Sequence, residues 1–268
     1  MKQTSMKQML FGTSPIRMKQ KLSKAAMALL FTSCFALLPK AQALNPKPDG
    51  GYPGGNTAAG QNALFRLTTG TYNTAVGALS LGSITTGNFN TATGAGTLLA
   101  NIADQNTATG AVALLSNTTG YQNTANGASA LFHNTGGFSN TANGTYALFS
   151  NTTGYENTAT GASALQSNTT AVGNTATGAS ALKENTTGFG NTATGFEALV
   201  FNTIGGDNTA DGAGALHNNS TGNNNTASGV DALLSNTTGS NNTAAGSNAL
   251  YNNTTGNHNT SNGFQALS

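Results

Sequence analysis

Residues 157–173 read NTATGASALQSNTTAVG, and the next seventeen residues, NTATGASALKENTTGFG, repeat the same pattern. Such units begin with Asn-Thr-Ala, or with Asn-Thr-Ser in the last one, at residues 56, 73, 90, 106, 123, 140, 157, 174, 191, 208, 225, 242 and 259. Every step is 17 residues except the step from 90 to 106, which is 16. A fixed period over about thirteen units predicts a solenoid, in which each unit is one coil that packs only on its neighbours.

The consensus of the unit is N-T-A-x-G-x-x-A-L-x-x-N-T-T-G-x-x, and we number its positions 1 to 17 from the first Asn. Positions 1, 2, 5 and 9 are Asn, Thr, Gly and Leu in all thirteen units. The segment Asn-Thr-Ala-x-Gly predicts a short strand whose alanine points inward while its two neighbours point outward, because side chains alternate along a strand. Stacked coils would then form one parallel sheet with a row of Asn side chains at its margin.

The limb that returns the chain to the next strand is open to two interpretations. Positions 5, 8, 9 and 12 have the i, i+3, i+4, i+7 spacing of a helix face, which favours a short helical turn over GxxALxxN. Stacked strands lie about 4.8 Å apart whereas packed helices need about 8 Å. The alternative is therefore an all-β roll with a second strand in each coil.

The first 43 residues have the pattern of a signal peptide for export. A basic stretch through Lys24 precedes an apolar run from Ala25 to Leu38, and Ala41-Gln42-Ala43 has the form of a cleavage site. Met18 is an alternative start of this signal. Residues 44–55 form a Pro/Gly-rich leader, and residues 56–268 form the solenoid. We therefore expect an exported protein, either extracellular or at the cell surface.

The composition disfavours several classes of function. Only 7% of residues are charged, and the part after Ala43 carries three basic against eight acidic side chains, a net charge of −5. A chain with so few cations has no basic face for phosphates, so we expect no nucleic-acid binding. His133, His217, His258 and the acidic residues occupy scattered repeat positions. We therefore expect no catalytic residues, no metal site, no cofactor and no enzymatic activity.

Two outward-facing features are candidate contact surfaces. The first is a set of paired threonines at positions 2 and 4 of successive coils, and the second is a row of aromatic residues at position 16. The threonines are Thr158, Thr160, Thr175, Thr177, Thr192 and Thr194, and the aromatic residues are Tyr121, Phe138, Tyr155 and Phe189.

The motif N-T-A-x-G-x-x-A-L, which covers residues 56–268, resembles the repeats of trimeric autotransporter adhesin heads and of tail-fibre-like bacterial surface proteins. The resemblance implies a β-roll that trimerises and binds host or matrix surfaces. The unit of those heads is shorter than 17 residues, and this chain shows no heptad stalk.

These observations predict a secreted or cell-surface structural or adhesive protein that makes multivalent contacts along the solenoid. Its expected partner is an extracellular surface, a polysaccharide or a protein, and a homo-oligomer (a trimer) or an end-to-end assembly is a candidate state. The alternative is a solenoid that binds ice or polysaccharide through its threonine rows.

Overall fold

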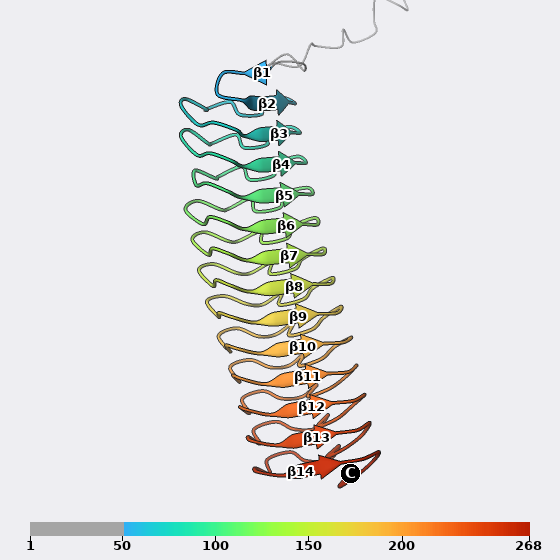
Figure 1. The fold of residues 1–268 in the computed structure, drawn as a ribbon. Helices are drawn as coiled ribbons and strands as arrows, with labels where there is room; N and C mark the ends of the chain where they lie inside the picture. The colour runs from blue at the N-terminus through green and yellow to red at the C-terminus, as the bar shows by residue number, and fades with distance from the viewer. Residues whose placement is uncertain (1–50) are drawn as a thin grey trace, which may run out of the picture. The chain divides into compact units, whose positions relative to one another are not determined.

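The computed structural model describes residues 51–268. The expected signal peptide, the alternative start at Met18 and most of the leader lie outside these residues. The described part is a β-solenoid in which each coil contributes one short strand to a single sheet, in chain order from β1 to β14 (Figure 1). The predicted solenoid, its 17-residue period and its one parallel strand per coil are confirmed.

The strands follow the Asn-Thr-Ala motif. They are β1 (Gly51–Tyr52), β2 (Asn56–Ala59), β3 (Thr74–Val76), β4 (Thr91–Thr93), β5 (Thr107–Thr109), β6 (Thr124–Asn126), β7 (Thr141–Asn143), β8 (Thr158–Thr160), β9 (Thr175–Thr177), β10 (Thr192–Thr194), β11 (Thr209–Asp211), β12 (Thr226–Ser228), β13 (Thr243–Ala245) and β14 (Thr260–Asn262). Strands β2 to β14 pair in parallel with equivalent positions opposite each other, as in the pairing of Thr175 with Thr192. The central alanine of each strand is buried, as predicted, and only β14 has a serine there.

The core is one continuous column of small and medium side chains. Its regular members are the strand alanine at position 3 and the Ala-Leu pair at positions 8 and 9, of which Ala164 and Leu165 are an example. Each coil thus contributes little apolar area by itself, and its core residues pack between those of the coils before and after it. The structure is stable only as a stack.

The return limb corrects the expected short helical turn, because no helix occurs within residues 51–268 and the limb is a series of turns. Positions 7 and 9 have positive φ angles, such as 57° at Ser163 and 51° at Leu165. Their backbone N–H groups donate to neighbouring coils: Ser163 to the carbonyl of Thr145 at 2.9 Å and Leu165 to that of Ala181 at 3.0 Å. A helix would use these donors internally.

The alternative of a second strand in each coil is likewise not present in the described residues. Left-handed residues at alternate positions place Ala164 and Leu165 on the same, inner side of the limb, although the two are adjacent in sequence. This is why their spacing resembled a helix face. The limb still keeps the close spacing of stacked strands, since parallel rings in adjacent coils have centroids 4.7–5.3 Å apart.

Two buried rows of asparagine support this stack. At position 1, the Oδ1 of Asn140 accepts from the backbone N–H of Asn157 at 3.1 Å and from its Nδ2 at 3.2 Å. At position 12, the Nδ2 of Asn151 donates to the Oδ1 of Asn134 at 2.8 Å. The first row runs through all coils, and no buried side-chain nitrogen or oxygen within residues 51–268 lacks a partner. The predicted asparagine row at the sheet margin is confirmed.

The glycine at position 5 marks the corner after each strand. Gly161 has a φ of +135°, and a Cβ atom there would lie 2.6 Å from the carbonyl carbon of Gly178 in the next coil. Both the backbone angle and the close approach of the coils therefore require glycine. This agrees with its presence at position 5 of every unit.

Part of the leader covers the edge of the sheet. Strand β1 pairs with β2 in antiparallel orientation, so that Tyr52 lies opposite Asn56. Tyr52 packs against the hydrophobic core, and the Nδ2 of Asn56 donates to the carbonyl of Pro53 at 2.6 Å. An antiparallel strand at this end interrupts the parallel pairing pattern of the rest of the sheet.

Candidate functional site

The six threonines selected from the sequence form one array on the outer face of the sheet. Thr158, Thr175 and Thr192 lie side by side at position 2 of strands β8 to β10, and Thr160, Thr177 and Thr194 lie side by side at position 4. All six are exposed except Thr158, which is half-buried. The structure thus brings these residues together as two parallel rows.

The hydroxyls of these threonines are not used within the fold. No hydrogen bond between residues 51–268 involves the hydroxyl of any of the six. The threonines at position 13 differ: the Oγ1 of Thr152 donates to the carbonyl of Thr169 at 3.1 Å, and this bond recurs along the stack. Of these two repeated threonine sets, therefore, only the one on the strand face offers free hydroxyls.

The strand face is not threonine throughout. At position 4, Asn126 and Asn143 replace threonine, and the Nδ2 of Asn126 donates to the Oδ1 of Asn143 at 3.3 Å. Asp211 and Ser228 follow in β11 and β12. The longest run in which both positions are threonine is the array of β8 to β10.

The aromatic row at position 16 is only partly brought together. The rings of Tyr121 and Phe138 are parallel with centroids 5.1 Å apart, and those of Phe138 and Tyr155 are parallel at 4.7 Å. Phe189 does not join this stack, because Val172 occupies position 16 in the coil between. Since the rings stack face to face, they present their edges rather than their faces along most of the row.

Two further aromatic groups were missed by the sequence analysis. Tyr72 and Phe89 stack at position 17 with centroids 5.2 Å apart, and Phe132 and Phe149 stack at position 10 at 5.3 Å. His133 lies edge-on to both rings of the second pair. The signal that could have found them is the recurrence of an aromatic residue at the same repeat position in adjacent units.

The structure also contains a surface depression that the sequence did not predict. It measures about 680 Å³ and lies over the 16-residue coil, residues 90–105. Its lining comes from that coil and from both neighbours, and includes Asn88, Asp104, Gln105, Tyr121 and Gln122. The 16-residue step in the sequence was its only signal.

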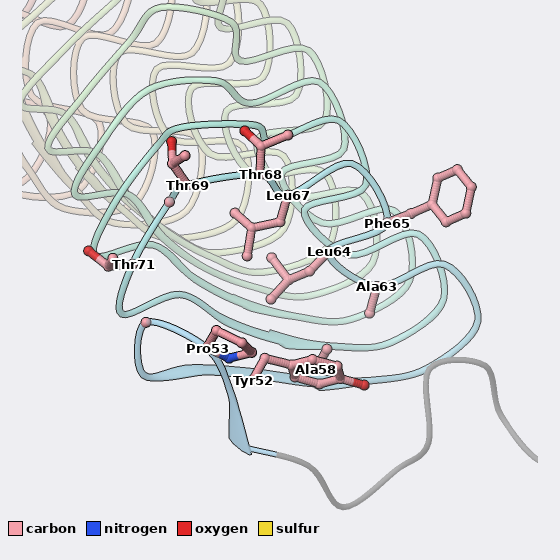
Figure 2. A pocket seen from close by; sticks show the side chains of 12 residues that line it. Tyr52, Pro53, Ala58, Ala63, Leu64, Phe65, Leu67, Thr68, Thr69 and Thr71 are labelled. Atoms are coloured by element: carbon pink, nitrogen blue, oxygen red, sulfur yellow. The ribbon is translucent and has the colours of Figure 1, made fainter.

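A second cavity, of about 630 Å³, lies at the first coil (Figure 2). Leu64, Leu67 and Ala63 line it from the return limb, and Tyr52 and Pro53 line it from the leader, whereas the Phe65 ring extends away from them. Leu67 and Ile84 stand at position 12 of the first two coils, where later coils have asparagine. The cavity is therefore the apolar end of the core column.

The titratable side chains are dispersed over the surface. His217 lies 3.6 Å from Glu197, and Lys183 lies 3.2 Å from Glu184, both as partly exposed pairs that contribute little to stability. Within residues 51–268 no three His, Cys, Asp or Glu side chains gather in a way that could hold a metal ion. No helix in this part of the chain has the length and apolar character to cross a membrane.

Comparison of the chain with family models, with curated proteins and with solved structures finds no match in any of the three. The geometry of the coils and of their outer surfaces is therefore the guide to function.

Proposed function

We propose that this protein is an exported structural or adhesive rod that makes many weak contacts along its strand face. The observation that carries the proposal is the array of strand-face threonines, whose hydroxyls have no partner within the fold and recur in register from coil to coil. A partner with similarly repeated groups would meet several of them at once. Suitable partners are a polysaccharide or a protein on an extracellular surface.

In this proposal, strong attachment comes from the sum of many weak contacts. A single hydrogen bond contributes about 0.5–1.5 kcal/mol net, which is too little for lasting attachment. Contacts on successive coils are held at fixed positions by one rigid sheet, so that each contact raises the effective concentration for the next. Attachment would thus depend on the number of coils engaged.

Export and the surface location rest on the sequence pattern of residues 1–43. The resemblance of the Asn-Thr-Ala-x-Gly motif to adhesin heads supports the adhesive role and, by analogy, a trimer. Light scattering on the mature chain, residues 44–268, tests the oligomeric state. A trimer would support the analogy, and a monomer would oppose it.

The test of the strand face is the substitution Thr175→Tyr, which places a large ring at the centre of the array without changing the core. We expect weaker retention on polysaccharide- or protein-coated surfaces than for the parent chain, with an unchanged melting temperature. Thr152→Val, at position 13, is the matched control, because that hydroxyl already donates within the fold. Equal retention of the parent and Thr175→Tyr would refute a role of this face.

A second candidate function is favoured by the same array. Free hydroxyls and threonine methyl groups in two straight rows are also suited to ice, where no chemical partner other than ordered water is needed. Thermal hysteresis of the purified protein separates the two functions. Clear hysteresis that Thr175→Tyr abolishes would replace adhesion with ice binding.

A further inference from the structure

The depression over residues 90–105 arises from the one irregular coil of the stack. Every complete coil apart from this one has two residues between position 12 and position 15, whereas here only Ile102 separates Asn101 from Ala103. The lining includes Thr86 and Thr119 from the coils on either side, together with Ile102 and Ala103. The missing residue therefore leaves a gap between two coils of normal length.

The two asparagine rows are joined at the shortened coil, where the row at position 12 begins after Ile84. The Nδ2 of Asn101 donates to the Oδ1 of Asn90 at 3.2 Å, and the Nδ2 of Asn106 donates to the Oδ1 of Asn101 at 3.2 Å. These bonds connect position 1 with position 12, which does not occur elsewhere within residues 51–268. The backbone of the shortened coil is thus tied into the asparagine row at position 1 on both sides.

An aromatic ring forms one wall of the depression. Tyr121 is the first member of the stacked row, and the face of its ring that Phe138 covers is directed to the next coil. At the same repeat position the preceding coil has Asp104, which has no ring to cover the other face. Tyr121 is 44% exposed and lines the depression. Among the rings of the row, Tyr121 alone lines this depression.

Polar side chains, among them Asp104, Gln105 and Gln122, also line the depression. One carboxylate oxygen of Asp104 accepts from the backbone N–H of Asn88 at 2.7 Å, and its other oxygen has no partner among residues 51–268. The Nε2 of Gln122 donates to the Oε1 of Gln105 at 3.0 Å. The amide nitrogen of Gln105 and the amide oxygen of Gln122 are left for a ligand.

We propose that this depression is a binding site for a neutral carbohydrate. A sugar ring has an apolar C–H face, which packs on an aromatic ring, and a rim of hydroxyls that both donate and accept hydrogen bonds. Tyr121 supplies the ring, Asp104 and Gln122 supply acceptors, and Gln105 supplies a donor. The site is separate from the strand-face threonines and does not depend on their role.

The charge of the lining selects against other ligands. The lining contains one carboxylate and no Lys or Arg, so a uronate, sulfate or phosphate group would be repelled. A neutral glycan meets no such penalty. We therefore expect neutral polysaccharides to bind and acidic ones not to bind.

The experiment is affinity electrophoresis of the full purified chain in gels that contain a soluble β-glucan, an α-glucan, a mannan or, as the acidic probe, alginate. We expect at least one neutral polysaccharide to retard the chain and alginate to leave its mobility unchanged. Tyr121→Ala should weaken the retardation about tenfold, because the stacking surface is lost. Phe196→Ala, which removes another exposed ring far along the chain, is the matched control and should bind as the parent does.

A second variant tests the depression without removing any side chain. Inserting one threonine between Ile102 and Ala103 restores a 17-residue coil and should fill the gap. We expect this variant to keep the circular dichroism spectrum and melting temperature of the parent and to lose the retardation. The proposal is overturned if no neutral polysaccharide retards the parent, or if the folded insertion variant is retarded as strongly as the parent.

The glycan site in the depression and the contact surface on the strand face can be tested separately. Thr175 does not line the depression, so Thr175→Tyr reports on the threonine array and Tyr121→Ala reports on the depression. Loss of retardation in Thr175→Tyr with retention in Tyr121→Ala would assign the glycan to the threonine array and overturn the site proposed here.

Discussion

At the scale of single residues, the buried asparagines are the polar counterpart of the core. Asn157 is fully buried; its Nδ2 donates to the carbonyl of Ala171 at 2.8 Å, and its Oδ1 accepts from the backbone N–H of Asn174 at 3.1 Å. Asn157 thus bonds to a backbone carbonyl of its own coil and to a backbone N–H of the next. Side-chain amides lower the stability when they are buried without partners. In this stack their hydrogen bonds instead hold neighbouring coils together.

Replacing Asn157 with alanine should therefore be strongly destabilising. Four buried hydrogen bonds would be lost and the backbone N–H of Asn174 would have no partner, which predicts a loss of about 3 kcal/mol in the free energy of unfolding. Denaturant unfolding followed by circular dichroism measures this loss. Asn126→Ala is the control, because Asn126 is exposed and has one side-chain bond of 3.3 Å. Similar losses for the two variants would contradict the role assigned to the buried row.

At the scale of the coil, the strand was predictable and the return limb was not. Alternation of Thr, Ala and a polar residue indicates which side chain of a strand points inward, and a 17-residue period places identical residues opposite each other. The limb depends on left-handed backbone angles at ordinary residues, such as Leu165 and Ser163, which are unfavourable when considered one residue at a time. Hydrogen bonds to both neighbouring coils stabilise them, and a single unit contains no signal of those bonds.

The left-handed position 7 offers a test of this account. Gly96 and Gly214 occupy it in two coils with φ of 65° and 67°, close to the 57° of Ser163. A serine Cβ atom is crowded at this angle by about 1–2 kcal/mol, so Ser163→Gly should raise the stability by about 0.5–1 kcal/mol after the greater chain entropy of glycine is subtracted.

The control for this prediction is the adjacent substitution Ala162→Gly. Ala162 does not have a positive φ angle, so glycine there gains nothing in the folded state and should lower the stability. Melting temperatures of the two variants decide the matter. If both variants melt below the parent, the limb does not have the backbone angles described.

At the scale of the whole molecule, the candidate surfaces follow from how the coils are stacked. The threonine array could be predicted because its residues recur at fixed positions, and strands β8 to β10 place them in register. The depression over residues 90–105 could not be predicted, since it depends on what a missing residue does to the space between two coils. The sequence places Phe189 in the same row as Tyr155, but Val172 in the coil between them keeps the two rings from stacking.

The stack predicts that coils are interchangeable units. Deleting residues 157–173 joins Glu156 to Asn174, which would pair Thr141 with Thr175. The asparagine row at position 1 would continue from Asn140 to Asn174, and the row at position 12 from Asn151 to Asn185. We expect a folded chain with an unchanged type of circular dichroism spectrum and only a modestly lower melting temperature, because one coil and one interface are lost.

Deleting Ala159 alone should lower the stability far more, although it removes a single residue. It moves a threonine into the core position of the strand and shifts every later side chain of that coil. The chain tolerates one missing residue after Asn101 because that loss falls in a turn and not in the strand. If the 17-residue deletion destabilises the protein more than the loss of Ala159, the coils are not equivalent modules.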